Sequence, residues 1–328
     1  MPQAAQASRP RIRLSSKQLA VYAAVIAAWI GYLVLTFLQR PNASANPYHF
    51  TDAQRIAIQL TIAVPYLFIW LAAFHGALQI KSYQTSLAEG THRAAFRKLA
   101  AGLAWLAVGL LVTTFVSSIR NLPTAGSAYP ALTVLLNHLY VLFPLVGFFC
   151  LAMGARGLAR ESGLRLTVGV FATAALTCLI VGGVQAYLIF SDAGRRTPSP
   201  LTGHATFYVP DVMLVTDYVI PTAISVAMAV FAAYGLQGFL RKSAAVIYEK
   251  SLPPLIGGLL MIMASTVILQ LLLSLGQGRL LGLGLGAILA IVYAFLLIQG
   301  VGYVLVARGS GRLARLQATI AKYQADTP

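Results

Sequence analysis

The chain has 328 residues, of which 58% are hydrophobic and only 10% are charged. Soluble domains carry about a quarter of their residues as charged ones, so this composition excludes a chain built mainly of water-soluble domains. The formal net charge of +16 would suggest nucleic acid in a soluble protein, but the basic residues here flank apolar runs. We therefore expect the lipid bilayer to be the main partner, and no nucleic acid.

Apolar runs long enough to cross a bilayer recur along the whole chain. A hydrocarbon core about 30 Å thick needs about 20 apolar residues in a helix. The runs fall at 18–38, 56–80, 99–118, 131–155, 166–190, 214–239, 254–275 and 281–305. The sequence thus predicts an all-α fold, a polytopic membrane helix bundle with eight transmembrane helices.

Lysine and arginine are unevenly shared between the two sides of this bundle. If the N-terminus is inside, eighteen of them lie on its side and six on the other. Cytoplasmic loops are enriched in these residues, so both termini are expected in the cytoplasm and the protein in the inner or plasma membrane. The same residues are expected to contact anionic lipids at the cytoplasmic face.

The two halves of the chain, 18–165 and 166–315, share landmarks in the same order. Asp52 and Asp211 each follow an aromatic-rich segment, and Gly76 and Gly235 each come twenty-four residues later. The halves end on Ala155-Arg156-Gly157-Leu158-Ala159-Arg160 and on Ala307-Arg308-Gly309 with Leu313-Ala314-Arg315. These matches predict two tandem four-helix repeats. Because four spans return the chain to the same side, a pseudo-two-fold axis along the membrane normal should relate them.

The expected organisation has four parts. Residues 1–17 form a basic cytoplasmic N-tail, 18–165 the first four-span repeat, 166–305 the second, and 306–328 a cytoplasmic amphipathic C-tail. Within that tail, residues 312–323 place apolar side chains at helical spacing, which is typical of a short helix on the inner leaflet. A frayed tail is the alternative.

Paired prolines suggest a binding site. Pro65 and Pro221 fall in the second and sixth predicted spans, and proline frees a backbone carbonyl. Corresponding helix breaks in two repeats are typical of transporter sites, although ordinary kinks are the alternative. Asp217, one turn before Pro221, is an acidic residue inside a predicted span, or an interfacial residue if the span begins later. Pro144 has no proline counterpart in the last span, and we interpret it as structural.

Other polar residues complete the candidate substrate-binding set. Asp52 and Asp211 lie in the long outer connections 39–55 and 191–213, where function often resides, although aromatic anchors of the interface are equally expected there. His138 and His75 are interpreted as hydrogen-bonding groups between helices, with His138 a candidate for binding. No H-x-x-x-H, H-E-x-x-H or C-x-x-C spacing occurs, so we expect neither a metal nor a cofactor.

Catalytic motifs such as G-x-S-x-G and the P-loop are missing from the sequence, so an enzyme is not expected. We predict a small-solute transporter or permease-like protein with a site between the two halves. The alternative is a non-enzymatic membrane scaffold or a partner subunit of a membrane complex. A membrane enzyme that acts on lipid or quinone is the third possibility, disfavoured by the scarcity of acid and base pairs inside the spans.

Overall fold

The computed structural model describes residues 15–38, 51–120, 129–163, 168–192, 219–243, 246–274 and 285–326. Within them the chain forms eight helices: α1 (Ser16–Leu38), α2 (Asp52–Ser86), α3 (Thr91–Arg120), α4 (Tyr129–Glu161), α5 (Val168–Asp192), α7 (Ile220–Lys242), α8 (Val246–Ser274) and α10 (Leu285–Asp326). Each overlaps one of the eight predicted runs. The all-α class is therefore confirmed.

Seven of these helices are long and apolar enough to cross a membrane. The qualifying segments in the described residues are Ser16–Phe37, Ile56–Ser86, Thr91–Val116, Val141–Glu161, Ile220–Lys242, Tyr248–Ile268 and Leu289–Leu316. The protein is therefore a multi-pass helical membrane protein. The predicted span at 166–190 corresponds to α5, which is not among the seven, so the count of eight spans stays a prediction.

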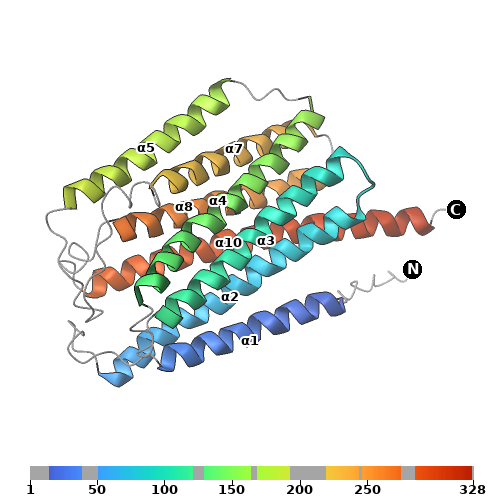
Figure 1. Ribbon diagram of the computed structural model, residues 1–328. Helices are drawn as coiled ribbons and strands as arrows, with labels where there is room; N and C mark the ends of the chain where they lie inside the picture. The colour runs from blue at the N-terminus through green and yellow to red at the C-terminus, as the bar shows by residue number, and fades with distance from the viewer. Residues whose placement is uncertain are drawn as a thin grey trace, which may run out of the picture.

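The helices run alongside one another and alternate in direction, so the start of α1 and the end of α10 lie at the same end of the bundle (Figure 1). We call this the basic end, because most of the described lysines and arginines lie toward it. They are Lys17, Lys81, Arg93, Arg97, Lys98, Arg156, Arg160, Arg241, Lys242, Lys250, Arg308, Arg312 and Arg315. The opposite end carries the starts of α2, α4, α7 and α10.

Local sequence fixes where α2 begins at the opposite end. Thr51 is its N-cap, and the Thr51 hydroxyl accepts a hydrogen bond from the Gln54 backbone N–H at 3.3 Å. The Gln54 side chain in turn accepts from the Thr51 N–H at 3.0 Å. This capping box satisfies two N–H groups that a helix start leaves free.

The helices pack in a recurring set of pairs. α3 packs along α4, and α8 packs along α10; α2 lies on α10, and α7 lies on α4. α2 also packs on α3, as α7 does on α8. The peripheral helix α1 rests on α2 and touches α3, and the peripheral helix α5 rests on α7 and touches α8. Each contact made by one of the first four helices thus has a counterpart among the last four.

Glycines bring the tightest of these pairs into backbone contact. A Cβ added to Gly102 of α3 would lie 2.7 Å from the Gly147 carbonyl oxygen of α4, and one added to Gly258 of α8 would lie 2.5 Å from the Gly302 carbonyl oxygen of α10. No side chain fits in such a space. Small residues are the usual means by which membrane helices approach closely.

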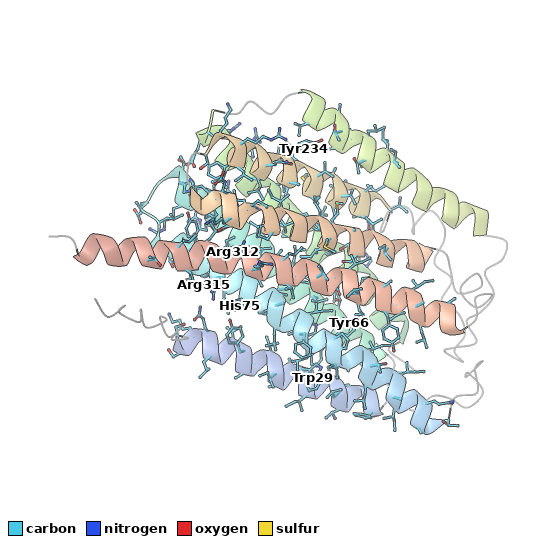
Figure 2. All side chains as sticks on the ribbon, turned by 180° about the vertical axis from the view of Figure 1, so that it is seen from behind. Trp29, Tyr66, His75, Tyr234, Arg312 and Arg315 are labelled. Carbon is cyan, nitrogen blue, oxygen red and sulfur yellow. The ribbon has the colours of Figure 1, made fainter. Side chains whose placement is uncertain are left out.

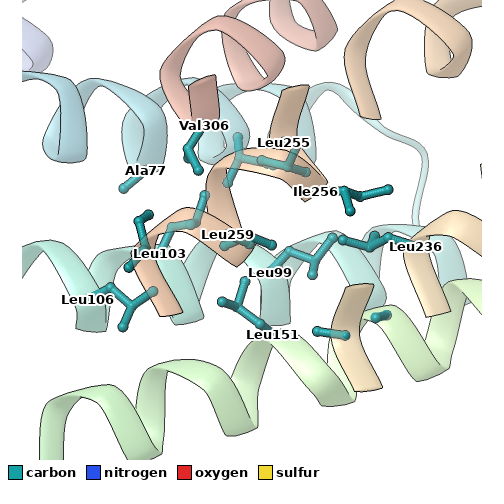
Figure 3. Close-up of a cluster of buried hydrophobic side chains, with 14 of the residues drawn as sticks. Ala77, Leu99, Leu103, Leu106, Leu151, Leu236, Leu255, Ile256, Leu259 and Val306 are labelled. Carbon is teal, nitrogen blue, oxygen red and sulfur yellow. The ribbon is translucent and has the colours of Figure 1, made fainter. Parts of the chain in front are cut away.

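One apolar core connects the two halves of the bundle (Figure 3). Its central side chains, at most 2% exposed, include Leu99 and Leu103 of α3, Leu236 of α7, and Leu255 and Leu259 of α8. Leu151 of α4 and Val306 of α10 also belong to this core, and each is 1% exposed. The halves of the helices that lie toward the basic end are therefore tightly packed.

The end of α10 differs from the sequence-based expectation. Residues 312–323 are helical, but they continue α10 instead of forming a separate helix. Leu313 is fully buried, and the Arg312 guanidinium Nη1 donates to the Lys250 carbonyl oxygen at 2.7 Å. These contacts hold the segment against the start of α8, and no proline interrupts α10.

Candidate functional site

A cavity of about 90 Å³ lies among α2, α3, α4, α8 and α10. We call it the central cavity. From the first half it is lined by Tyr66, Leu106, Gly109, Leu110, Thr113, Thr114, Phe143 and Pro144, and from the second half by Ile262, Thr266, Phe295, Gln299 and Tyr303. Helices of both halves therefore line it.

The depth of the central cavity follows from residue positions along three helices that start at the opposite end. Tyr66 and Gln299 are each fourteen residues after the first residue of their helices, and Pro144 is fifteen after that of α4. At 1.5 Å per residue these positions lie about 21–23 Å along each helix. All three residues line the cavity, which therefore lies inside the bundle; Figure 2 labels Tyr66 on α2, with His75 nearer the basic end.

Threonine hydroxyls give the cavity wall hydrogen-bond acceptors. Thr113 donates to the Gly109 carbonyl oxygen at 2.7 Å, Thr114 to that of Leu110 at 2.7 Å, and Thr266 to that of Ile262 at 3.0 Å. Each hydroxyl proton is therefore used within its own helix, while the oxygen lone pairs can still accept. Among the residues that the structure describes, the lining contains no acidic or basic side chain.

Gln299 is the exceptional polar residue of this wall. It is 8% exposed, and its side-chain Oε1 has no hydrogen-bond partner. In the amide orientation of this structure, the acceptor end of the side chain is therefore buried without a partner. A buried polar group left in this way costs about 1–3 kcal/mol. Such a residue beside a cavity is a candidate for ligand recognition.

A second polar region lies at the basic end, and we call it the His92 cluster. The His92 imidazole Nδ1 is 2.7 Å from the Glu161 carboxylate, and its Nε2 is 2.8 Å from the Tyr248 hydroxyl. The Tyr248 hydroxyl is 2.9 Å from that of Tyr83, and the Thr91 hydroxyl donates to Glu161. Because a carboxylate only accepts, His92 Nδ1 donates to Glu161. When Nε2 carries no proton, it accepts from the Tyr248 hydroxyl, which then accepts from that of Tyr83.

The His92 cluster joins the two halves. Tyr83, His92 and Glu161 come from α2, α3 and α4, whereas Tyr248 begins α8. The Phe239 ring of α7 packs 4.9 Å from the Tyr248 ring, centroid to centroid, and 5.9 Å from that of His92. Tyr83 is 2% exposed and Tyr248 is 9% exposed. Aromatic rings and hydrogen bonds therefore close the interface between the halves here.

His75 also makes a contact between helices, as its interpretation required. Its imidazole Nδ1 is 2.5 Å from the Tyr22 hydroxyl, which attaches α1 to α2. The two rings stack with centroids 6.1 Å apart. That interpretation is confirmed for His75.

Of the sequence-based candidates within the described residues, none is among the residues that line the central cavity. Within the described residues, Pro65 is inside α2 next to the lining residue Tyr66, Pro221 is the second residue of α7, and His138 lies exposed on α4. Asp52 is the first residue of α2. Asp211 and Asp217 lie outside the described residues. Their part in binding stays a prediction.

Sequence reasoning missed several residues that the structure makes prominent. Pro144, interpreted as structural, lines the central cavity, and Gln299 was not singled out. His92 was not singled out either, and it lies in the first turn of α3. Its partners are 69 and 156 residues away in the chain, so no local motif could have connected them.

The fold and these two regions define a multi-pass helical membrane protein with a largely apolar cavity that contains a few polar groups. No family model, curated protein or solved structure matches the chain. Its function is therefore inferred from the residues described above.

Proposed function

We propose that the protein is a small-solute transporter whose solute binds in the central cavity, between two four-helix halves. The observation that carries this proposal is the cavity itself, because helices of both halves line it and it contains a buried amide without a partner. A scaffold would be expected to pack the same interface solidly. Transporter sites lie where two repeats meet, near the middle of the membrane.

The helix contacts support the two-repeat arrangement. If α1, α2, α3 and α4 are exchanged with α5, α7, α8 and α10, every pair in the packing described above is exchanged with another observed pair. This is the behaviour expected of two repeats related by a pseudo-two-fold axis.

Close contacts support the same relation residue by residue. Gly102 meets Gly147 and Leu151, as Gly258 meets Gly302 and Val306. Gly154 meets Ala95 and Leu99, as Gly309 meets Ser251 and Leu255. The equivalent residues are 155 or 156 apart. This spacing agrees with the match of Leu158-Ala159-Arg160 to Leu313-Ala314-Arg315. In the other C-terminal match, Gly157 is paired with Gly309, and that spacing is three residues shorter.

The same spacing supports an axis through both polar regions. Three equivalent pairs line the central cavity together: Leu106 with Ile262, Leu110 with Thr266, and Pro144 with Gln299. At the basic end the hydrogen-bonded residues His92 and Tyr248 are also equivalent. Equivalent residues meet only near the axis that relates them, so we propose that the axis runs from the His92 cluster to the cavity.

This arrangement suggests how transport would proceed. The apolar core and the His92 cluster close the basic end, so the solute enters from the opposite end. Opening of the basic end requires the two halves to separate between His92 and Tyr248. Alternating access by movement of one repeat against the other is the usual mechanism for such folds. By the excess of positive charge, the basic end is proposed to face the cytoplasm.

Flux measurements with a filled cavity test the proposal. Thr266→Phe places a ring in the central cavity, whereas Thr173→Phe changes a threonine that also donates within its helix but lies exposed on α5. In proteoliposomes that take up small neutral solutes, the first variant should lose most of the flux and the second should keep it. Flux no higher than in empty liposomes across a broad solute panel would reject transport.

A labelling experiment tests the threading. Glu89 lies between α2 and α3 and is 94% exposed. Glu89→Cys and a cysteine added after residue 328 should react with an impermeant reagent from the same side of intact vesicles. Reaction from opposite sides would contradict the proposed topology.

The sequence-based candidates enter this proposal as further binding residues. Asp217, Pro221, Pro65, Asp52, Asp211 and His138 are proposed to contribute to substrate binding. Asp217→Asn should alter solute flux while leaving expression unchanged, and unaltered flux would remove it from the site.

A further inference from the structure

We infer that the central cavity binds small neutral molecules with a hydrogen-bond donor and acceptor side by side, as in a carboxamide, and that Gln299 is the residue that recognises them. This inference deepens the proposed function and rests on the same cavity. It concerns binding, however, so it can be tested separately from transport.

The size of the central cavity limits the ligand. A cavity needs about 10–15 Å³ to hold one water molecule, so 90 Å³ corresponds to about six to nine. A molecule of about four to six non-hydrogen atoms would fill this space. Larger metabolites would require the halves to move apart.

The composition of the wall excludes a charged ligand. In the part of the chain that the structure describes, no acidic or basic side chain lines the cavity. An ion buried without an opposite charge loses its hydration and gains no compensating partner. The bound molecule is therefore neutral.

The hydrogen-bonding groups of the wall point to an amide-like ligand. The Gln299 side chain combines an acceptor, Oε1, with two N–H donors. A ligand with an adjacent acceptor and donor would satisfy both ends at once. The last torsion of glutamine is broad, so the amide can turn to present both groups. The lone pairs of the Thr113 and Thr266 hydroxyls can accept a further N–H of the ligand.

The residue equivalent to Gln299 explains why recognition is one-sided. In the 155-residue relation between the halves, Gln299 corresponds to Pro144, which also lines the cavity and has no polar side-chain atom. Phe143 lies beside Pro144 in this wall. The ligand therefore meets a polar wall on α10 and an apolar wall on α4, which suits a small molecule with one amide and one methyl group.

Three molecules of equal size test which chemical features a ligand needs in order to bind. Acetamide has the paired donor and acceptor, acetone lacks the donor, and acetate is charged. The midpoint of thermal unfolding of the purified full-length protein is measured in detergent against the concentration of each. A ligand that binds only the folded state raises this midpoint in a concentration-dependent way. We expect acetamide to raise it, and acetone and acetate to have at most a tenth of its apparent affinity.

Two variants assign the effect to Gln299. Gln299→Met keeps the length of the side chain and removes the amide, and it should raise the acetamide concentration for half-maximal effect about tenfold or more. Leu297→Met, on a side chain 68% exposed two residues earlier, should leave it unchanged. If acetone or acetate matches acetamide, or if acetamide has no effect, the inference is wrong whether or not the variants fold. Unchanged acetamide binding in Gln299→Met would also overturn it.

Flux separates the failure of this inference from that of the proposed function. If acetamide binds with dependence on Gln299 but does not cross proteoliposome membranes, the transporter proposal fails and the inference stands. If solutes cross but neither binding nor flux of acetamide depends on Gln299, the transporter proposal stands and the inference fails.

Discussion

The central cavity and the His92 cluster both place polar groups between the two halves, but they differ in whether those groups have hydrogen-bond partners. In the cluster, each of Glu161, His92, Tyr248 and Tyr83 has a hydrogen-bond partner, and aromatic rings surround them. In the cavity, Gln299 has an amide oxygen without a partner beside open space. A satisfied network stabilises one conformation, whereas an unsatisfied buried group gains most when a ligand arrives.

This contrast assigns different roles to two sites on one proposed axis. In the proposed transport function, the His92 cluster holds the basic end closed and the central cavity accepts the solute. The tight helix pairs joined by Gly102 and Gly258 move as units on this view, because their backbones touch. The contacts that can open are the side-chain contacts between the halves.

The largest effect is expected from breaking the cluster with Tyr248→Phe. This change removes one hydroxyl but deprives two groups, His92 Nε2 and the Tyr83 hydroxyl, of their partner. We expect the free energy of unfolding to fall by about 2 kcal/mol, measured by chemical denaturation in detergent. Tyr234→Phe, on a tyrosine 45% exposed on α7, is the matched control and should change it by less than about 0.5 kcal/mol.

The same variant should also affect function if the cluster is a gate. Tyr248→Phe weakens only the closed state of the basic end, so it should alter the rate of solute flux while acetamide binding in the cavity persists. Loss of stability with unchanged flux would make the cluster a structural contact only.

The opposite sign is expected for Gln299→Met, and this sharpens the comparison. Removing the amide from the unliganded protein removes a buried group that has no partner, so the free energy of unfolding should stay equal or rise by about 1 kcal/mol. A fall of more than about 1 kcal/mol would mean that the amide already has a partner in solution, and the cavity would lose its main polar feature.

The sequence was sufficient for the helices but not for these two sites. Apolar runs are local, so each of the eight runs could be located without knowledge of packing. The pairing of Gly76 with Gly235 in two repeats stays a prediction. Both do pack against the partner half, Gly76 on Val306 and Ala307 of α10 and Gly235 on Ala155 of α4.

The sequence could not reveal which side chains line the cavity or form the cluster, because this depends on how each helix is rotated about its own axis. Gln299 is one of several glutamines within the apolar runs, and only packing decides that it lines a cavity. Pro144 and Gln299 are equivalent by position but differ in chemistry, so a search for matching residues overlooked them. His92, Glu161 and Tyr248 come from three separate helices, and their spacing in the chain carries no signal of their contact.

The smallest effect is expected for Thr266→Val, which tests whether the threonine hydroxyl in the cavity wall contributes to ligand binding. The Thr266 hydroxyl donates to the Ile262 carbonyl oxygen of its own helix, so its loss should change the free energy of unfolding by less than about 0.5 kcal/mol. Its lone pairs face the ligand, however, and the equivalent residue across the cavity, Leu110, offers none. Acetamide binding should therefore weaken about threefold, the loss of roughly one weak hydrogen bond, while Thr173→Val on the exposed face of α5 leaves it unchanged. Equal binding in both variants would confine recognition to Gln299 alone, and a loss as large as that of Gln299→Met would move the main polar contact from α10 to α8.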